Sequence, residues 1–339
     1  MSKRNAYVHF GLHKTGTTAL QNSFWKNRDA LGLHGIYLPK IGRRYPHKRY
    51  LEHHNVAMEI SSDRNFLQSN GGLSAIIEEC RNVDEDILLS SEYFTHSLVS
   101  EERLAVLHSA FSNAGFDLVA IIYLRNQCSY FESIFPQFFV GGSSDDASVV
   151  FQDVIDMGRF RYGEWMVPFH YATFIETLNA VGFETRVRNF HELAHESVEF
   201  DFYTYALNLP ASFEFQPIGP RNVSSPSEAL TMFLRNRFLG MDVKPPKWKL
   251  RQISNIIEEK PLLLPREASA LMHRIEDENS RILSEYGIDL RGVKYTNSRR
   301  GVDMLRLYSN TTVQIAKSIL DEEQDVTAIK AYIDKLTFG

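Results

Sequence analysis

The chain has 339 residues, of which 43% are hydrophobic and 23% charged, and its formal net charge is −5. This composition excludes a disordered chain, a collagen-like repeat and a small disulfide-stabilised scaffold. At roughly 150 residues per domain, the length allows one large domain with additions or two domains. A net-acidic chain lacks the broad basic excess of a general nucleic-acid-binding protein, so we expect no nucleic-acid partner.

The cysteine content and the apolar runs bear on the compartment. Cys80 and Cys128 form no CxxC pair and no Cys/His cluster, which favours a reducing environment. No apolar leader precedes the first strand-like segment, and no apolar run reaches the roughly 18 residues of a membrane span. We therefore expect a soluble, cytoplasmic protein without a membrane span. Because the histidines show no metal-ligand spacing, we expect no metal site.

Short β-branched or aromatic runs alternate with longer helical patterns over the first 190 residues. Several of these runs are almost continuously apolar, which is typical of strands covered by helices on both faces. The alternation predicts an α/β fold of three layers with a central parallel sheet. Strands are predicted at 6–11, 35–39, 86–91, 117–124 and 184–190, and helices at 17–31, 72–81, 100–114, 129–140 and 168–181.

The later part of the chain has a different pattern. From about residue 191 it is mostly helical in periodicity, with amphipathic segments and little strand character. We expect a core over residues 1–235 and a helical extension over 236–339 that packs on the core.

A glycine-rich segment, Gly11–Thr18, lies between a predicted strand and a predicted helix. Backbone N–H groups of such a loop and of the helix N-terminus converge on an anion, and Thr17 and Thr18 add hydroxyl donors. A Walker A loop has lysine directly after its second glycine. Here Thr17 holds that place and Lys14 precedes Gly16. Since no apolar run ends in a clear Walker B aspartate, we predict a P-loop-like fold that binds an anion without an obvious metal.

A second anion-binding segment is predicted at the end of the most apolar strand. Ser129 and Glu132 have capping-box spacing, which predicts a helix N-terminus at Ser129. Arg125 would then lie in the preceding loop and Ser133 just past the first helical turn, so both could reach one phosphate. By themselves, the two residues would also fit a surface ion pair and a polar helix face. Their place at a strand end favours the phosphate site.

The loop sequence HKTGTTALQ, residues 13–21, resembles the 5′-phosphosulfate loop of the PAPS-dependent sulfotransferases. These enzymes transfer a sulfuryl group from 3′-phosphoadenosine 5′-phosphosulfate (PAPS), and in their loop a lysine precedes a Gly-Thr-Thr group. The eight-position separation of Arg125 and Ser133 is similar to the family's 3′-phosphate motif, although Arg-Asn-Gln stands here where Arg-Asn-Pro is common. The resemblance covers about residues 6–235 and is most specific in these two motifs.

The resemblance implies PAPS as donor, PAP as product and no metal. Lys14 would stabilise the bridging oxygen of the leaving phosphate, and Arg125 with Ser133 would bind the 3′-phosphate. Arg221, in a segment that resembles the one returning toward the nucleotide, would lie near the 3′-phosphate. The residues that would hold the 5′-phosphosulfate are His13, Lys14, Thr15, Gly16, Thr17 and Thr18.

Two candidates for a general base stand close to the predicted sheet. Glu92 directly follows the strand at 86–91, where the family commonly has a His or Glu that serves as base. Its alternative role is a helix-capping or salt-bridged carboxylate. His53 and His54 form the second candidate, because bacterial-type members often carry a histidine pair in this region and neutral imidazole suits base chemistry near pH 7. The choice between Glu92 and His54 stays open at this point.

Residues 40–49 hold five Lys or Arg and no acid. In a net-acidic chain this segment is either an acceptor loop for an anionic substrate, a lid over the donor, or a solvated loop.

These observations favour a sulfotransferase that moves the sulfuryl group of PAPS to a hydroxyl or amine of a glycan, lipid or small molecule, including an anionic one. The alternatives are a P-loop kinase or NTPase that uses ATP, and a nucleotide-binding module without catalysis. The sequence leaves the acceptor and the oligomeric state open.

Overall fold

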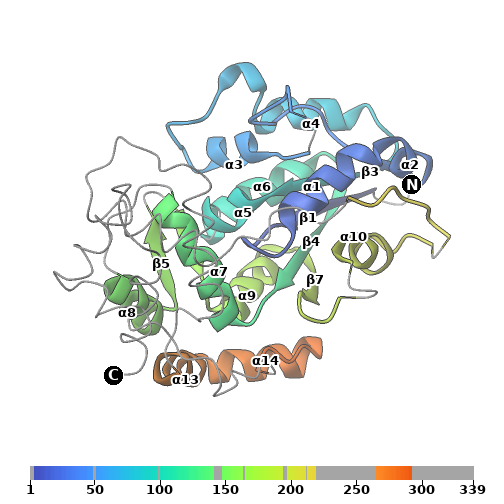
Figure 1. Ribbon diagram of the computed structural model, residues 1–339. Helices are drawn as coiled ribbons and strands as arrows, with labels where there is room; N and C mark the ends of the chain where they lie inside the picture. The colour runs from blue at the N-terminus through green and yellow to red at the C-terminus, as the bar shows by residue number, and fades with distance from the viewer. Residues whose placement is uncertain are drawn as a thin grey trace, which may run out of the picture. The chain divides into compact units, whose positions relative to one another are not determined.

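The computed structural model describes residues 4–48, 51–97, 100–140, 147–162, 165–193, 197–210, 212–218 and 265–291 (Figure 1). The chain divides into two compact units. The first takes Met1–Arg125, Gly163–Arg221 and Asp277–Leu290, and the second takes Asn126–Tyr162, Asn222–Glu276 and Arg291–Gly339. The expected boundary between 235 and 236 lies outside the described residues and stays a prediction.

The first unit is built on a five-stranded sheet in the order β2-β3-β1-β4-β7. Every neighbouring pair of strands in it is parallel, which confirms the predicted α/β class and the central parallel sheet. All five predicted strands are present, and only the one expected at 35–39 is much shorter. The strands are β1 Arg4–Phe10, β2 Ile36–Tyr37, β3 Asp86–Ser91, β4 Phe116–Leu124 and β7 Glu184–Asn189.

Helices cover both faces of this sheet. Successive residues of a strand point to opposite faces, and in β1 the His9 ring meets Phe24 of α1 whereas the Phe10 ring meets Phe174 of α9. The three expected layers are thus present.

The other elements of this unit are α1 Thr17–Lys26, α2 Arg28–Leu33, α3 His54–Ile60, η1 Gln68–Asn70, α4 Leu73–Arg81, α5 Glu92–Ser97, α6 Glu101–Asn113, β6 Trp165–Pro168, α9 Tyr171–Val181, α10 Val198–Asp201, the π-helical turn η3 Phe202–Ala206, and all but the first residue of α14 Glu276–Tyr286.

In the second unit, the structure describes α7 Gln127–Val140, α8 Ala147–Met157, β5 Arg159–Tyr162 and α13 Pro265–Arg274. The predicted helix start at Ser129 is wrong, because α7 begins at Gln127. Asn126 Oδ1 accepts a hydrogen bond from the Ser129 backbone N–H at 3.1 Å. Asn126 therefore caps the helix, and Ser129 is its third residue rather than its cap.

The single helix predicted at 17–31 is also interrupted, since α1 ends at Lys26 and α2 begins at Arg28. The side chain of Asn27 bonds to the Ser23 carbonyl at 2.9 Å and accepts from the backbone N–H of Gln216 at 2.6 Å. A side chain that competes for backbone groups in this way ends a regular helix.

Candidate donor-binding loop and general base

The glycine-rich loop connects β1 to α1 at the carboxyl end of the sheet. Gly16 is the N-cap residue of α1 and has φ +81°, a left-handed conformation that glycine adopts without steric cost. No side chain in the described structure caps α1, and its first turn has no acidic residue. The amides of that turn are therefore available to an anion from outside the helix, as in other phosphate-binding helix starts.

Two threonines stabilise the loop itself. The hydroxyls of Thr15 and Thr17 both donate to the Leu12 carbonyl, at 2.7 and 3.1 Å. A Cβ at Gly11 would lie 2.6 Å from the Thr17 methyl, so glycine is required there for the loop to close. In this conformation Thr17 offers an anion its backbone N–H rather than its hydroxyl. The Thr18 side chain is exposed.

Two cations meet at the loop. Arg125, at the end of β4, donates from Nη1 to the Lys14 carbonyl at 2.9 Å. Burial lowers the pKa of Lys14, and the neighbouring charge of Arg125 lowers it further. No carboxylate of the described chain pairs with the Lys14 ammonium. Two adjacent positive charges of this kind favour a bound anion.

The other predicted donor-site residues are placed only in part. Ser133 lies on α7 in the second unit, and its hydroxyl donates to the Ser129 carbonyl at 2.8 Å. A joint 3′-phosphate site of Arg125 and Ser133 therefore stays a prediction. His13 is half-buried within the loop, and its role stays a prediction as well. Arg221 lies outside the described residues.

Strand register brings the loop and the first base candidate together. β1 lies beside β3 with Phe10 opposite Ser91, and the Gly11 N–H donates to the Ser91 carbonyl at 3.2 Å. Glu92, the first residue of α5, thus leaves the sheet next to the first residue of the loop. This is the carboxyl edge, where open α/β sheets bind their ligands.

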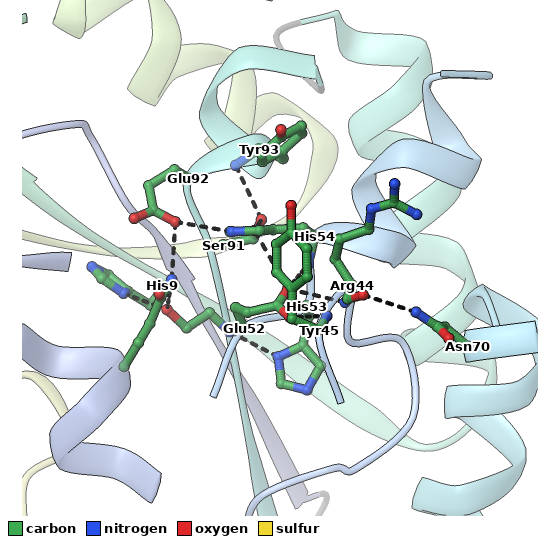
Figure 2. A network of polar contacts seen from close by, with 12 residues as sticks. His9, Arg44, Tyr45, Glu52, His53, His54, Asn70, Ser91, Glu92 and Tyr93 are labelled. Carbon is green, nitrogen blue, oxygen red and sulfur yellow. Dashed lines mark hydrogen bonds and ion pairs between the residues drawn. The ribbon is translucent and has the colours of Figure 1, made fainter. Parts of the chain in front are cut away.

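The two alternative bases lie in one polar network (Figure 2). His54 Nε2 lies 3.6 Å from Glu92 Oε2. On its other side, His54 Nδ1 is 2.7 Å from Ser91 Oγ. Gln21 of α1 donates to the same Glu92 oxygen at 2.9 Å. Residues from α1, α3 and the β3–α5 junction therefore meet at a single carboxylate.

The carboxyl group of Glu92 has a raised pKa. It is raised to about 7, chiefly by burial and to a smaller extent by the charge of Glu52, while the hydrogen bond from Gln21 lowers it in part. Since His54 is in ion-pair range of this carboxyl, the two groups exchange protons as a coupled pair. Such a pair, near neutrality and close to an anion loop, suits general base chemistry.

His53 has a structural role. Its Nδ1 accepts from the Ser90 backbone N–H at 3.2 Å, so the ring proton is on Nε2, which donates to the Pro39 carbonyl at 3.1 Å. The side chain is buried, and burial lowers its pKa to about 3. His53 therefore ties its segment to β3 as a neutral ring, and only His54 faces Glu92.

Sequence reasoning did not single out Gln21, Ser91 or Glu52. Gln21 had a usable signal, because it is one helical turn after Thr17 and Thr18 and so lies on the side of α1 that faces the loop. Glu52 and Ser91 stand directly before His53 and Glu92 in the sequence. Ser91 contacts a residue 37 positions away and Glu52 bonds to the backbone of an irregular loop, so neither had a local signal.

Arg43 of the basic segment is not solvated, although a solvated loop was one interpretation. Its side chain is buried, with the guanidinium 4.4 Å from the Trp25 ring and Nη2 donating to the Lys48 carbonyl at 2.7 Å. Arg49 lies outside the described residues.

Comparison with known proteins gives one structural likeness. No family model matches the chain, and no curated protein matches it. The chain is similar to a sulfotransferase from Alicyclobacillus acidocaldarius whose structure is solved, with 16% identity and a TM-score of 0.41, over 68% of this chain and 92% of that chain. The α/β class follows from the five parallel strands themselves.

Two further features concern membranes and metals. Among the described residues, no helix is both long and apolar enough to cross a membrane. The same part of the chain brings together no group of three or more His, Cys, Asp or Glu that could hold a metal ion.

Proposed function

We propose that this chain is a sulfotransferase that moves the sulfuryl group of PAPS to a hydroxyl of an acceptor. The observation that carries the proposal is the adjacency of two sites on neighbouring strands. The lysine-bearing loop follows β1 and the Glu92–His54 pair adjoins the end of β3, with Phe10 and Ser91 in register. One edge of the sheet thus offers an anion site and a base side by side.

The loop fits the anionic donor. Lys14 and Arg125 are adjacent, and α1 presents an uncapped first turn. We expect Lys14 and the amides of Thr17 and Thr18 to hold the 5′-phosphosulfate, and Arg125 to serve the 3′-phosphate. When bound, PAPS supplies the sulfuryl group and a phosphate leaving group.

In the proposed reaction, the Glu92–His54 pair takes the proton of the acceptor hydroxyl as the hydroxyl oxygen bonds to sulfur. The bond between sulfur and the bridging oxygen breaks, and Lys14 balances the negative charge that this oxygen carries away with PAP. General base catalysis of this kind contributes roughly 10²–10⁴-fold to the rate. Charge stabilisation at the leaving oxygen contributes further.

The pair acts as one base because it shares one proton. The Ser91 hydroxyl can either donate to His54 Nδ1 or accept from it, and its oxygen also accepts from the Tyr93 N–H at 3.0 Å. The proton between the two groups is therefore carried either by His54 Nε2 or by Glu92. A choice between Glu92 and His54 is then unnecessary.

A Ser–His–Glu set also occurs in hydrolases, but this one does not fit a nucleophilic serine. Ser91 is fully buried at the end of β3, so a substrate has no access to its oxygen. The hydroxyl instead orients His54.

Donor binding provides the first test. PAP without magnesium should raise the melting temperature of the wild type and of Lys26→Ala, a control on α1 whose Nζ donates to the Pro217 carbonyl. Lys14→Ala should lose this stabilisation, because it removes the cation of the loop. Stabilisation by ATP with magnesium, but not by PAP, would favour the kinase alternative.

Transfer provides the second test. A screen of hydroxylated glycans, lipids and small molecules with labelled PAPS should identify an acceptor. Undiminished transfer by Lys14→Ala would contradict the role of the lysine. Donor binding without transfer to any acceptor would favour a nucleotide-binding module.

A further inference from the structure

The basic segment at 40–48 contains a cation that the donor site does not use. The buried carboxylate of Glu52 accepts from the backbone N–H groups of Arg44 and Tyr45, at 3.1 and 2.7 Å. Both carboxylate oxygens are thus committed to the loop backbone. The guanidinium of Arg44 forms no ion pair with any described residue, and its buried Nη1 has no hydrogen-bond acceptor there.

The nearby acid does not neutralise this guanidinium either. Asp63 lies close enough to act on the Tyr93 phenol, as Arg44 does. Its Oδ1 instead accepts from the backbone and side-chain nitrogens of Asn65, at 2.7 and 2.8 Å. A charged N–H that is buried without an acceptor costs free energy, which an acceptor supplied by a ligand would recover.

Arg44 is linked to the proposed base through Glu52, whose Oε2 accepts from the backbone N–H groups of both Arg44 and His54, at 3.1 and 3.0 Å. Its charge lowers the pKa of Tyr93 against the stronger effect of burial, and the Tyr93 ring lies 4.6 Å from the His54 ring. Tyr45, 37% exposed, adds a second aromatic ring next to the Arg44 guanidinium at 5.9 Å. Figure 2 shows Arg44, Tyr45, Tyr93 and His54 in this one network.

We propose that Arg44 binds a carboxylate of the acceptor and so selects hydroxylated acids as substrates. A guanidinium binds a carboxylate through two parallel hydrogen bonds, which fixes both the distance and the orientation of the bound group. The aromatic rings of Tyr45 and Tyr93 would flank the ring of a phenolic acid or of a sugar acid. The inference that the acceptor hydroxyl faces His54 and Glu92 rests on the proposed function. The inference that Arg44 binds a carboxylate does not.

The test uses matched acids and neutral analogues. Binding to the PAP-loaded protein is measured for 4-hydroxybenzoate against 4-hydroxybenzamide, and for methyl glucuronide against methyl glucoside. In at least one pair the acid should bind the wild type roughly tenfold more tightly. The pair that shows the preference distinguishes an aromatic acid from a sugar acid.

Variants assign the preference to Arg44. Arg44→Gln and the similarly long Arg44→Met should remove it, and Lys40→Gln, an exposed cation of the same segment, should keep it. Circular dichroism identifies a variant that fails to fold, in which case the other decides. Equal binding of acid and neutral analogue in both pairs, or a preference that survives the loss of the guanidinium, overturns the proposal.

The two proposals fail separately. An Arg44-dependent preference for acids without any transfer from labelled PAPS would overturn the sulfotransferase and leave the anion site. Transfer to an acceptor without such a preference would overturn the anion site alone. If PAP does not bind, the same titrations are made on the protein without it.

Discussion

Two serine–histidine pairs stand at the end of β3, on opposite faces of the sheet. Ser90 Oγ lies 2.9 Å from His9 Nδ1, and Ser91 Oγ lies 2.7 Å from His54 Nδ1. His9 is completely buried among aromatic rings, and burial lowers its pKa to about 3. The His54 side chain is 13% exposed and lies 3.6 Å from Glu92.

The difference between the pairs comes from what lies on the far side of each ring. His9 Nε2 is buried without a hydrogen-bond partner in the described structure, so a charge there would have no compensation. His54 Nε2 faces a carboxylate, so a proton can be held between the two groups. The same two residue types therefore form a packed core group in one place and a group within ion-pair range of a carboxylate in the other.

The largest expected effect is on transfer. Glu92→Gln and His54→Asn should each lower the single-turnover rate roughly 10²–10⁴-fold, because each breaks the shared base. PAP affinity, measured in parallel, should stay unchanged. The double variant should be no slower than the slower single variant, since residues that act as a unit are not additive. Full rates in both single variants would exclude the pair as the base.

The next effect is on stability and its dependence on pH. The pKa of Glu92 is raised to about 7, so the neutral carboxyl favours the folded state below its unfolded pKa, and this stability is lost as pH rises through about 7. Relative to wild type, Glu92→Gln should gain on the order of 2–3 kcal/mol in unfolding free energy between pH 5 and 9. Denaturant titrations across this range measure it. Parallel curves for the two proteins would show that the carboxyl has an ordinary pKa.

His9 should show the opposite pH window. Its pKa is lowered to about 3, so the folded state loses stability as pH falls below the unfolded value of about 6.5. His9→Leu should therefore gain on the order of 2 kcal/mol over wild type at pH 5 and change little at pH 8, with transfer retained. The same denaturant titrations apply. A loss of transfer in His9→Leu would place the two pairs in one functional network.

The smallest effect concerns Gln21, which lies between the pairs at 2.9 Å from Glu92 Oε2 and 3.5 Å from Ser90 Oγ. Gln21→Leu should lower the rate roughly tenfold and move the half-maximal rate to higher pH, because its hydrogen bond lowers the pKa of Glu92. The matched control is Ser23→Ala. Ser23 is on α1, the helix of Gln21, and the change removes its buried contact with Tyr203. Equal pH–rate profiles for the two variants would argue against a positioning role for Gln21.

The sequence predicted the fold more completely than it predicted the contacts of the candidate site. Apolar runs predicted strands such as β1 and β4, because a strand buried on both faces must be apolar along its length. Helix ends were less accurate, since Asn27 and Asn126 redirect the chain through side-chain hydrogen bonds. Such competition between side chain and backbone depends on the folded neighbours as much as on the local pattern.

What the sequence determined by itself is the order of strands and helices, the lysine-bearing loop after the first strand and the place of Glu92 after β3. These features are local, so periodicity and spacing are sufficient to find them. Only the tertiary structure decided that His54 rather than His53 faces Glu92, that Gln21 joins them and that Arg44 forms no ion pair with a described residue. The contacts of His54 and Gln21 join residues that are far apart in the chain, so no local pattern could show them.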